Sequence, residues 1–452
     1  MRDHSKHVEL KREDAIARLV EAARFEPQVE VVGIHEAFGR VTAVDCEAKV
    51  DVPNALCAQM DGIAVRFADF EGGMPDTSAW QLGCEYDWAN TGTALPEGFD
   101  TAIRIEDVQF DGGVGEVGLD NLNPGRLEIL VAPGKRGASC RERGANFEAG
   151  QMLLPAGTRL TPTKVSALAM CGYSEVEVIV KPKVVFIPTG DELVSPGREL
   201  PAGKAYDSNG VLLEGKLLLW GADPVIYECI PDDWSIIKET ILKACAEADI
   251  VAINAGSSKG AKDFTMEILE EIGQVICHET NHGPGRHTSA SVVNGTPVLG
   301  LSGPPSGCEI TADWYLKPLV DSFLFGKVVE FEKVTAVAGD FGKSVGHGPD
   351  GGPSGPAKGK GPGGPGGPGG AGGPGGGPGG KGPGKDFFAI RPVSLERTPE
   401  GLIAKPIANG LHPDLLKLDE ADGYLEMHPF AYRDLEPGDE VTVELRYPYT
   451  QL

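Results

Sequence analysis

The ten residues Lys183-Val-Val-Phe-Ile-Pro-Thr-Gly-Asp-Glu192 decide the fold class of this chain. Their first half, 183–187, is an apolar, β-branched run of strand length, and their second half is a glycine-bearing loop. The same order of strand and glycine loop returns at 249–263 and at 296–307. Helical patterns alternate with these strands, at 207–219, 234–246, 262–272 and 309–325. This alternation predicts a three-layer α/β domain, with helices on both faces of a mostly parallel sheet.

The three glycine loops carry the candidate binding residues. Because ligands of open parallel sheets bind outside the carboxyl ends of the strands, we expect the loops to converge on one crevice. Glycine lets backbone N–H groups approach a ligand closely, and serine hydroxyls add donors that suit a phosphate. Turn formation alone is the competing explanation for the glycines. The candidate binding residues of the loops are Thr189, Gly190, Asp191, Gly256, Ser257, Ser258, Gly260, Gly303 and Pro305.

Acidic residues accompany these donors. Glu192 and Asp263 lie in the loops, and Asp61 lies in a Met-Asp-Gly turn at 60–62. Carboxylates beside phosphates indicate a bridging Mg²⁺, since like charges otherwise repel. Helix capping would explain Asp191 and Asp263 without a ligand. The chain has no G-x-x-x-x-G-K-S/T phosphate loop, which disfavours Walker-type NTPases.

A second group of candidate ligands lies in one segment of eleven residues, inside the α/β part. It contains Cys277, His278, His282 and His287. Zinc binding is one explanation, although the spacing fits no standard zinc motif. The other explanation is that one of the histidines, or Arg286, faces an anion.

Composition limits the class of partner. The chain has 452 residues, with 66 acidic and 41 basic side chains and a formal charge of −25. This balance argues against nucleic acid or an anionic membrane as the partner, because both require basic surface. No apolar run approaches the ~20 residues of a membrane span, and segment 1–12 lacks the apolar core of a signal peptide. Nine scattered cysteines without a C-x-x-C pair complete the expectation of a soluble, cytoplasmic protein.

The remaining segments predict further domains. Ranges 10–23 and 160–171 have helical patterns, and Thr161-Pro162 suits a helix start. Short β-branched runs between 45 and 132 predict a small β-rich domain. The last part, 328–452, is β-like, but a Gly/Pro tract interrupts it at 344–385. The tract has almost nothing apolar to bury, so we expect a disordered insertion at a loop tip.

Six motifs are specific in combination. They are the turn at 60–62, the stretch 90–106 with Thr91, and the loops at 188–193, 207–209, 256–263 and 300–305. With them the chain resembles the molybdopterin molybdenumtransferase family, the enzymes of the last step of molybdenum cofactor assembly. The fold of that family also forms the C-terminal part of gephyrin. The resemblance runs over nearly the whole chain.

The resemblance implies a multidomain α+β subunit of four parts, usually in a homodimer. Residues 1–50 and 141–179 would form a helical dimerisation domain, and 51–140 a β-rich domain. Residues 180–326 would form the α/β molybdopterin-binding domain. Residues 327–452 would form a C-terminal β-barrel with the insertion at 344–385.

The resemblance also implies the activity, which is Mg²⁺-dependent insertion of molybdate into adenylylated molybdopterin with release of AMP. Glu192 and Asp263 would lie by the phosphates and the metal ion. Asp61 of the neighbouring subunit would assist oxyanion positioning or proton transfer, and Thr91 would line the same cleft. Arg286 stands in a loop where the family usually has lysine, and a guanidinium and an ammonium differ on an oxyanion.

Three functions follow from these residues. The first is the transferase, with molybdate as substrate and tungstate as the alternative oxyanion. The second is a non-catalytic paralogue that binds or delivers the pterin cofactor. The third is a scaffold that uses the Gly/Pro tract and the barrel as interaction surfaces.

Overall fold

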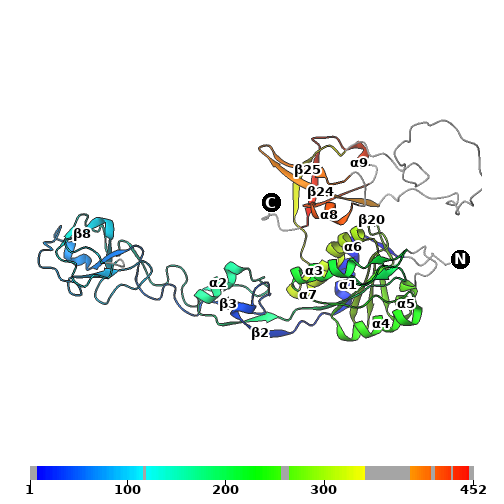
Figure 1. Ribbon diagram of the computed structural model, residues 1–452, viewed down its shortest axis with the longest axis horizontal. Coiled ribbons are helices and arrows are strands. Elements are labelled where there is room, and N and C mark those ends of the chain that lie inside the picture. Colours follow the sequence, from blue (N-terminus) through cyan, green and yellow to red (C-terminus); the bar gives the residue numbers. More distant parts are fainter. Residues whose placement is uncertain are drawn as a thin grey trace, which may run out of the picture. The chain divides into compact units, whose positions relative to one another are not determined.

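The computed structural model describes residues 8–115, 119–255, 264–341, 387–408, 413–428 and 431–446 (Figure 1). The chain forms two compact units. The β-rich unit contains residues 28–180, and the main unit contains residues 1–27 together with 181–452. Within the described part of the chain, no helix combines the length and the apolar character that crossing a membrane requires.

A six-stranded sheet forms the centre of the main unit, in the order β16-β13-β17-β22-β21-β18. Strands β16, β13, β17 and β22 are parallel, and β21 runs opposite to its neighbours β22 and β18. The bounds are β13 Lys183–Ile187, β16 Asp223–Ile226, β17 Ile250–Ala255, β18 Gln274–Cys277, β21 Ser289–Val293 and β22 Thr296–Ser302. The predicted mostly parallel sheet is confirmed. The reversed strand was missed, although Asn294-Gly295, both with positive φ, forms the tight turn that makes a hairpin of β21 and β22.

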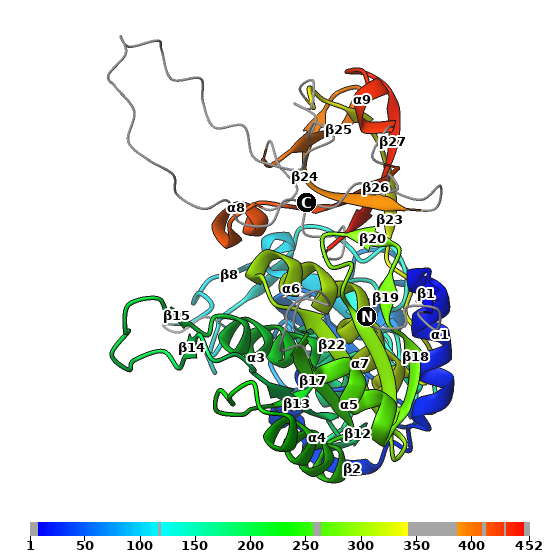
Figure 2. The same ribbon diagram turned by 90° about the vertical axis from the view of Figure 1, so that its right-hand side faces the viewer.

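Helices cover both faces of this sheet (Figures 1 and 2). On one face, α4 (Trp234–Glu247) and α5 (Thr265–Ile272) pack Ile237, Ile241 and Ile268 against Val185 and Val251. The other face carries α1, α3, α6 and α7. Because the parallel strands are buried on both sides, their residues are apolar at successive positions rather than at alternate ones.

The ends of these helices follow from their capping residues. Helix α3 (Asn209–Trp220) begins after Asp207, whose Oδ1 accepts a hydrogen bond of 3.1 Å from Gly210 N, and ends at Gly221 with φ 88°. Helix α4 begins after Asp233, which accepts from Ser235 N and Ile236 N. The start of α4 has an acidic N-cap, whereas the N-cap of α3 is Ser208, directly after Asp207. Gly221 supplies the left-handed C-cap expected from the sequence.

The predicted helix 309–325 is longer and less regular than expected. It begins four residues earlier, as α6 (Pro305–Thr311), continues as a π-helical turn, η5 (Ala312–Leu316), and ends as α7 (Lys317–Phe325). The start agrees with Pro305 in the first turn, where the missing N–H has no helical partner to lose. The π-turn turns Asp313, Trp314 and Tyr315 into the interior, where all three are buried.

The first helix, α1 (Arg12–Ala23), belongs to the main unit, whereas the resemblance grouped it with 28–50 and 141–179. It contacts strands β18, β21 and β22 through a buried stripe of Ala15, Ile16 and Leu19. Just before it, β1 (Glu9–Leu10) pairs with β19 (Glu279–Thr280). The helix therefore covers the part of the sheet that contains the reversed strand.

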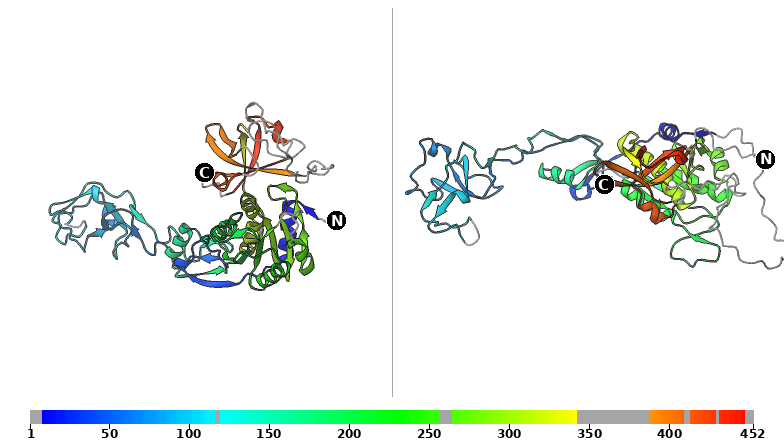
Figure 3. Two further views of the ribbon diagram at one scale, coloured as in Figure 1. Left: turned by 45° about the vertical axis from the view of Figure 1, so that its right-hand side comes forward. Right: turned by 90° about the horizontal axis from the view of Figure 1, so that it is seen from above.

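The C-terminal part of the main unit is a five-stranded barrel, drawn in yellow to red in Figure 3. Strand β24 pairs with both β25 and β26, which closes the order β24-β25-β23-β27-β26. The bounds are β23 Lys333–Ala338, β24 Phe388–Thr398, β25 Gly401–Pro406, β26 Gly423–Met427 and β27 Glu440–Leu445, with short helices α8 Leu415–Asp419 and α9 Ala431–Asp434. A further short strand, β20 (His282–Gly283), pairs with β24. The Gly/Pro insertion at 344–385 lies outside the described residues.

In its described residues the β-rich unit contains short antiparallel strands, one α-helix and three short 3₁₀ helices. Strand β5 (Gly62–Val65) lies between β6 (Tyr86–Ala89) and β7 (Thr101–Arg104). Helix α2 (Pro162–Met170) has the predicted cap, since Thr161 accepts from Lys164 N. The other pairs are β2 Val29–Gly33 with β12 Glu175–Ile179, β3 Cys46–Glu47 with β11 Met152–Leu154, β4 Cys57–Ala58 with β10 Cys140–Arg141, and β8 Val108–Phe110 with β9 Leu127–Ile129.

Gly62 is required for this arrangement, and its replacement is a test of the β-rich unit. A Cβ at position 62 would lie 1.9 Å from the carbonyl oxygen of Ile103 on the paired strand β7. We expect Gly62→Ala to lower the free energy of unfolding by about 2 kcal/mol, because the strands must separate to admit the methyl group. Thermal unfolding measures this loss. Gly72→Ala is the control, since a Cβ there meets nothing within 4 Å, and equal melting temperatures for the two variants would contradict the explanation.

Candidate functional site

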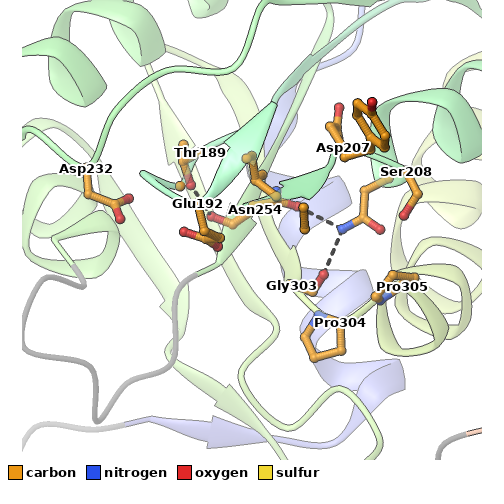
Figure 4. A pocket seen from close by; sticks show the side chains of 14 residues that line it. Thr189, Glu192, Asp207, Ser208, Asp232, Asn254, Gly303, Pro304 and Pro305 are labelled. Carbon is orange, nitrogen blue, oxygen red and sulfur yellow. Dashed lines mark hydrogen bonds between the residues drawn. The ribbon is translucent and has the colours of Figure 1, made fainter. Parts of the chain in front are cut away.

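A cavity of about 430 Å³ lies at the carboxyl ends of β13, β17 and β22 (Figure 4). It is the position at which open parallel sheets bind ligands. Its wall is formed by the loop after β13, the start of α3, the end of β17 and the start of α6. The lining residues are Thr189, Gly190, Glu192, Leu193, Ala205, Tyr206, Asp207, Ser208, Asn209, Asp232, Asn254, Gly303, Pro304 and Pro305.

A short hydrogen-bond network joins three of these segments. Asn209 Nδ2 donates to Asn254 Oδ1 at 3.1 Å and to the carbonyl of Gly303 at 2.9 Å, as the dashed lines in Figure 4 show. Thr189 Oγ1 donates to the carbonyl of Asn254 at 3.3 Å. The side chains of Asn209 and Asn254 are buried, so the network holds the start of α3 against the ends of β17 and β22.

Glu192 faces the cavity from the loop after β13. Gly190 precedes it with φ 148°, and a Cβ at Gly190 would come within 2.8 Å of both carboxylate oxygens of Glu192. Glycine therefore leaves space for this carboxylate. The backbone carbonyl of Glu192 accepts from Ala205 N at 2.9 Å, next to the pair of β14 (Leu193–Val194) and β15 (Ala205–Tyr206).

Asp191, a candidate binding residue, is not among the described residues that line the cavity. Its backbone N–H donates to Asp232 Oδ2 at 3.4 Å, and Asp232 N donates to Asp191 Oδ1 at 3.3 Å. The two aspartates thus fix the two loops to each other. Asp232, which the sequence did not single out, lines the cavity beside Glu192.

The charge of the described lining is negative. It contains three carboxylates, Glu192, Asp207 and Asp232, and among the residues that the structure describes there it contains no lysine or arginine. An anionic ligand in such a cavity needs a cation to offset the repulsion. Carboxylate and amide oxygens are hard donors, and Mg²⁺ typically takes one or two carboxylates together with ligand phosphates. These carboxylates do not form a three-residue metal-binding group in the described part of the chain, so a Mg²⁺ here would be held by the exposed Glu192 together with the phosphates of the ligand.

Residues 256–263 lie outside the described part of the chain, and with them the candidates Gly256, Ser257, Ser258, Gly260 and Asp263, as well as Lys259 and Lys262. The loop follows Ala255, the last residue of β17.

Asp61 and Thr91 form a pair in the β-rich unit. Asp61 Oδ1 accepts from Thr91 N at 2.7 Å and from Thr91 Oγ1 at 2.8 Å. These two hydrogen bonds hold the pKa of Asp61 below its ordinary value, and the one from the Thr91 backbone has the larger effect. Asp61 is exposed, so it is an ionised and accessible carboxylate at neutral pH.

Arg286 is half exposed and pairs with carboxylates. Its Nε lies 3.2 Å from Glu279 Oε2, and its Nη2 lies 3.7 Å from Glu9 Oε2. Arg286 is not among the described residues that line the cavity. The structure thus gives this guanidinium two acidic partners of its own.

The cysteine and histidines near it do not converge. His278 Nε2 lies 2.9 Å from Glu270, and Cys277 is buried in the sheet. His282 is buried, with Nδ1 donating to the carbonyl of Pro284 at 2.9 Å and Nε2 accepting from the Tyr315 hydroxyl at 2.7 Å. No metal-binding group of three such residues occurs in the described ranges. The zinc explanation therefore has no support in the described residues.

His282 predicts a pH dependence of stability. Burial lowers its pKa to about 4, from an ordinary value near 6.5. Since the unfolded chain takes up this proton at higher pH than the folded chain, stability present above pH 6.5 is lost as the pH falls towards 4. We expect a loss of about 2 kcal/mol between pH 7.5 and 5 from this residue. Denaturant unfolding at both pH values measures it, and His282→Gln should remove this contribution to the slope; an unchanged slope would show that His282 is not its source.

Five polar residues of the cavity lining were not among the candidate site residues: Asp207, Ser208, Asn209, Asp232 and Asn254. Asp207 and Asn209 belong to the motif at 207–209, which stands at the start of a helix. Asn254 is the last polar residue of a buried strand. A polar residue at the end of an apolar strand is the signal that could have identified Asn254.

Two family models match the chain. The MoeA N-terminal region (domain I and II) matches residues 10–172, and the probable molybdopterin binding domain matches residues 185–322, the segment that contains the described cavity. Curated relatives named molybdopterin molybdenumtransferase include that of Haemophilus influenzae, 27% identical over 68% of this chain and 76% of its own length. The one from a Nostoc species is 29% identical over 68% and 72%.

A solved structure extends the likeness to nearly the whole chain. The molybdopterin biosynthesis moea protein of Pyrococcus horikosii matches 98% of this chain and 100% of its own, with a TM-score of 0.67 and 26% identity. The matched length includes the α/β sheet, the β-rich unit and the five-stranded barrel, which confirms the predicted fold class. The chain therefore combines a MoeA N-terminal region with a probable molybdopterin binding domain, and its fold is similar over nearly its whole length to that of a MoeA protein of molybdopterin biosynthesis.

Proposed function

We propose that this protein is a molybdopterin molybdenumtransferase that takes adenylylated molybdopterin and molybdate and releases AMP. The observation that carries the proposal is the acidic cavity inside the matched molybdopterin-binding segment, built from oxygen donors at the ends of parallel strands. Names of relatives at 27–29% identity support the same activity.

Glu192, with Asp263 as second ligand, would hold Mg²⁺ against the phosphates of the ligand. A bound Mg²⁺ neutralises charge on phosphoryl oxygens, which lowers the barrier to cleavage of a phosphoanhydride. The chain's own residues bind and orient the ligand. Backbone N–H groups of the glycine loops and the amides of Asn209 and Asn254 supply fixed dipoles around it.

We propose further that the protein is a homodimer in which Asp61 and Thr91 act on the cavity of the partner. Support comes from exposed apolar residues on α3, the helix whose first residue, Asn209, lines the cavity. Val211, Leu218 and Leu219 are 60%, 58% and 78% exposed, and exposed apolar residues that cluster on one element mark an interaction surface. A cytoplasmic location is part of the proposal, because all nine cysteines are free thiols.

Release of AMP tests the proposed function. Purified protein with adenylylated molybdopterin, Mg²⁺ and molybdate should release AMP, and omission of molybdate or addition of a chelator should stop the release. Tungstate in place of molybdate measures the choice of oxyanion. AMP release that does not depend on the oxyanion would contradict the proposal.

One observation favours the second candidate function, binding or delivery of the pterin cofactor without catalysis. Arg286, the residue in place of the usual family lysine, is engaged by Glu279 and Glu9. Ligand binding with no AMP release under the same conditions would establish this candidate.

A further inference from the structure

Four charged side chains are buried together in the main unit, away from the residues that line the cavity. They are Lys216 on α3, Glu309 on α6, Asp313 on η5 and Arg446, which directly follows β27 of the barrel. Each side chain is at most 10% exposed. Burial of four charges requires complete pairing, because an uncompensated charge in the interior is strongly destabilising.

The pairing is complete within the cluster. Lys216 Nζ lies 2.7 Å from Asp313 Oδ1 and 3.4 Å from Glu309 Oε1. Arg446 forms an ion pair with Glu309 and lies 3.5 Å from Asp313 Oδ2. The hydroxyl of Tyr424, on barrel strand β26, donates to Asp313 Oδ2 at 2.9 Å. Two cations and two anions thus leave no net charge.

The two helices of this cluster are the two that line the cavity. Helix α3 begins at Asn209 and α6 begins at Pro305, and both residues lie in the cavity wall. Their starts are joined by the hydrogen bond from Asn209 to the carbonyl of Gly303. Lys216 lies about two turns along α3 and Glu309 about one turn along α6, so their ion pair joins the same helices a second time.

Arg446 connects the barrel to these two helices, which are joined to each other at both places. It donates to the carbonyls of Leu418 and Ala421, in and beside α8, as well as to Glu309. We propose that Arg446 is a positioning residue, through which the barrel fixes the spacing of α3 and α6 and thereby the width of the cavity between Asn209 and Pro305. The inference rests on the proposed function wherever it is tested by KM and kcat, because those constants are measured on turnover of adenylylated molybdopterin.

A matched pair of buried arginines tests it. Arg12 pairs with Glu444 of β27 at 2.6 and 2.7 Å and stacks on Trp314 of η5 at 4.1 Å, and neither of these partners lies on α3 or α6. Arg446→Met and Arg12→Met should both lower the melting temperature. Arg446→Met should also raise KM for adenylylated molybdopterin about tenfold with kcat within about twofold, because the cavity walls shift. Arg12→Met should leave KM unchanged.

Charge balance separates positioning from stability. The double variant Arg446→Met/Glu309→Gln restores neutrality, with Lys216 and Asp313 still paired, so most of the lost melting temperature should return. If KM is higher in the double variant than in Glu309→Gln alone, Arg446 acts by position, because Glu309 itself pairs with Lys216. If KM returns together with the melting temperature, or rises equally in Arg12→Met, the inference is overturned.

Amide hydrogen exchange provides a readout that does not depend on turnover. Residues 207–213 and 303–310 of the full chain should exchange faster in Arg446→Met than in Arg12→Met. If the proposed function is wrong but the inference holds, the wild type releases no AMP, whereas the difference in exchange between the two variants persists. Equal exchange in the two variants would overturn the role of Arg446 whatever the ligand.

Discussion

Glu192→Gln is expected to lower molybdate-dependent AMP release about a hundredfold, because it removes the exposed carboxylate that would hold Mg²⁺ against the phosphates. The substitution keeps the size of the side chain. It also leaves the local backbone intact, since the contact of Glu192 with the β14–β15 pair is made by its carbonyl, at 2.9 Å from Ala205 N. The variant should therefore fold normally and bind the pterin ligand, but need more Mg²⁺ for half-maximal rate.

A Mg²⁺ titration of AMP release in wild type and variant measures this effect. Glu199→Gln is the control, because Glu199 is an exposed carboxylate of the next segment, between β14 and β15, that does not line the cavity. It changes the charge of the chain by the same amount, which excludes a general electrostatic effect. Equal Mg²⁺ dependence in all three proteins would remove Glu192 from the metal site.

The α/β core could be predicted because its elements are defined by local chemistry. Strand β13 has the predicted bounds, 183–187, since an apolar run ends at Pro188. Helix α3 ends at Gly221, which takes the left-handed conformation that glycine favours. The glycine loops then place Thr189, Gly190, Glu192, Gly303 and Pro305 in one cavity, because all of them follow parallel strands of one sheet.

Features that depend on contacts between distant segments could not be predicted. Glu9, a partner of Arg286, lies at the start of the chain, and its strand β1 reaches β19 through tertiary pairing. Lys216 and Glu309 look like surface charges in a helical pattern, because nothing near them in sequence shows that Arg446 returns from the barrel to pair with them. Long-range charge pairs leave no periodic signal, so sequence patterns assign such residues to the solvent side.

The role of Asp61 was proposed from the resemblance. Because the chain is divided into two units, Asp61 could act on the cavity of its own subunit or on that of the partner. Asp61 belongs to the β-rich unit, whereas Glu192 belongs to the main unit. Two exposed turns of the same chain can meet within one subunit or across a dimer. The choice matters because only the second makes dimerisation necessary for catalysis.

Mixing two inactive variants decides between these arrangements. Asp61→Ala and Glu192→Gln should each lose most AMP release as homodimers. If Asp61 acts on the partner's cavity, a mixed dimer has one site with both residues intact and one with neither. Random exchange makes about half of all dimers mixed, so activity should recover to about a quarter of wild type. If Asp61 acts on the cavity of its own subunit, every site in the mixture keeps one lesion and no activity returns. Asp61→Ala mixed with Asp61→Ala/Glu192→Gln is the matched control, since no combination of those subunits restores a complete site.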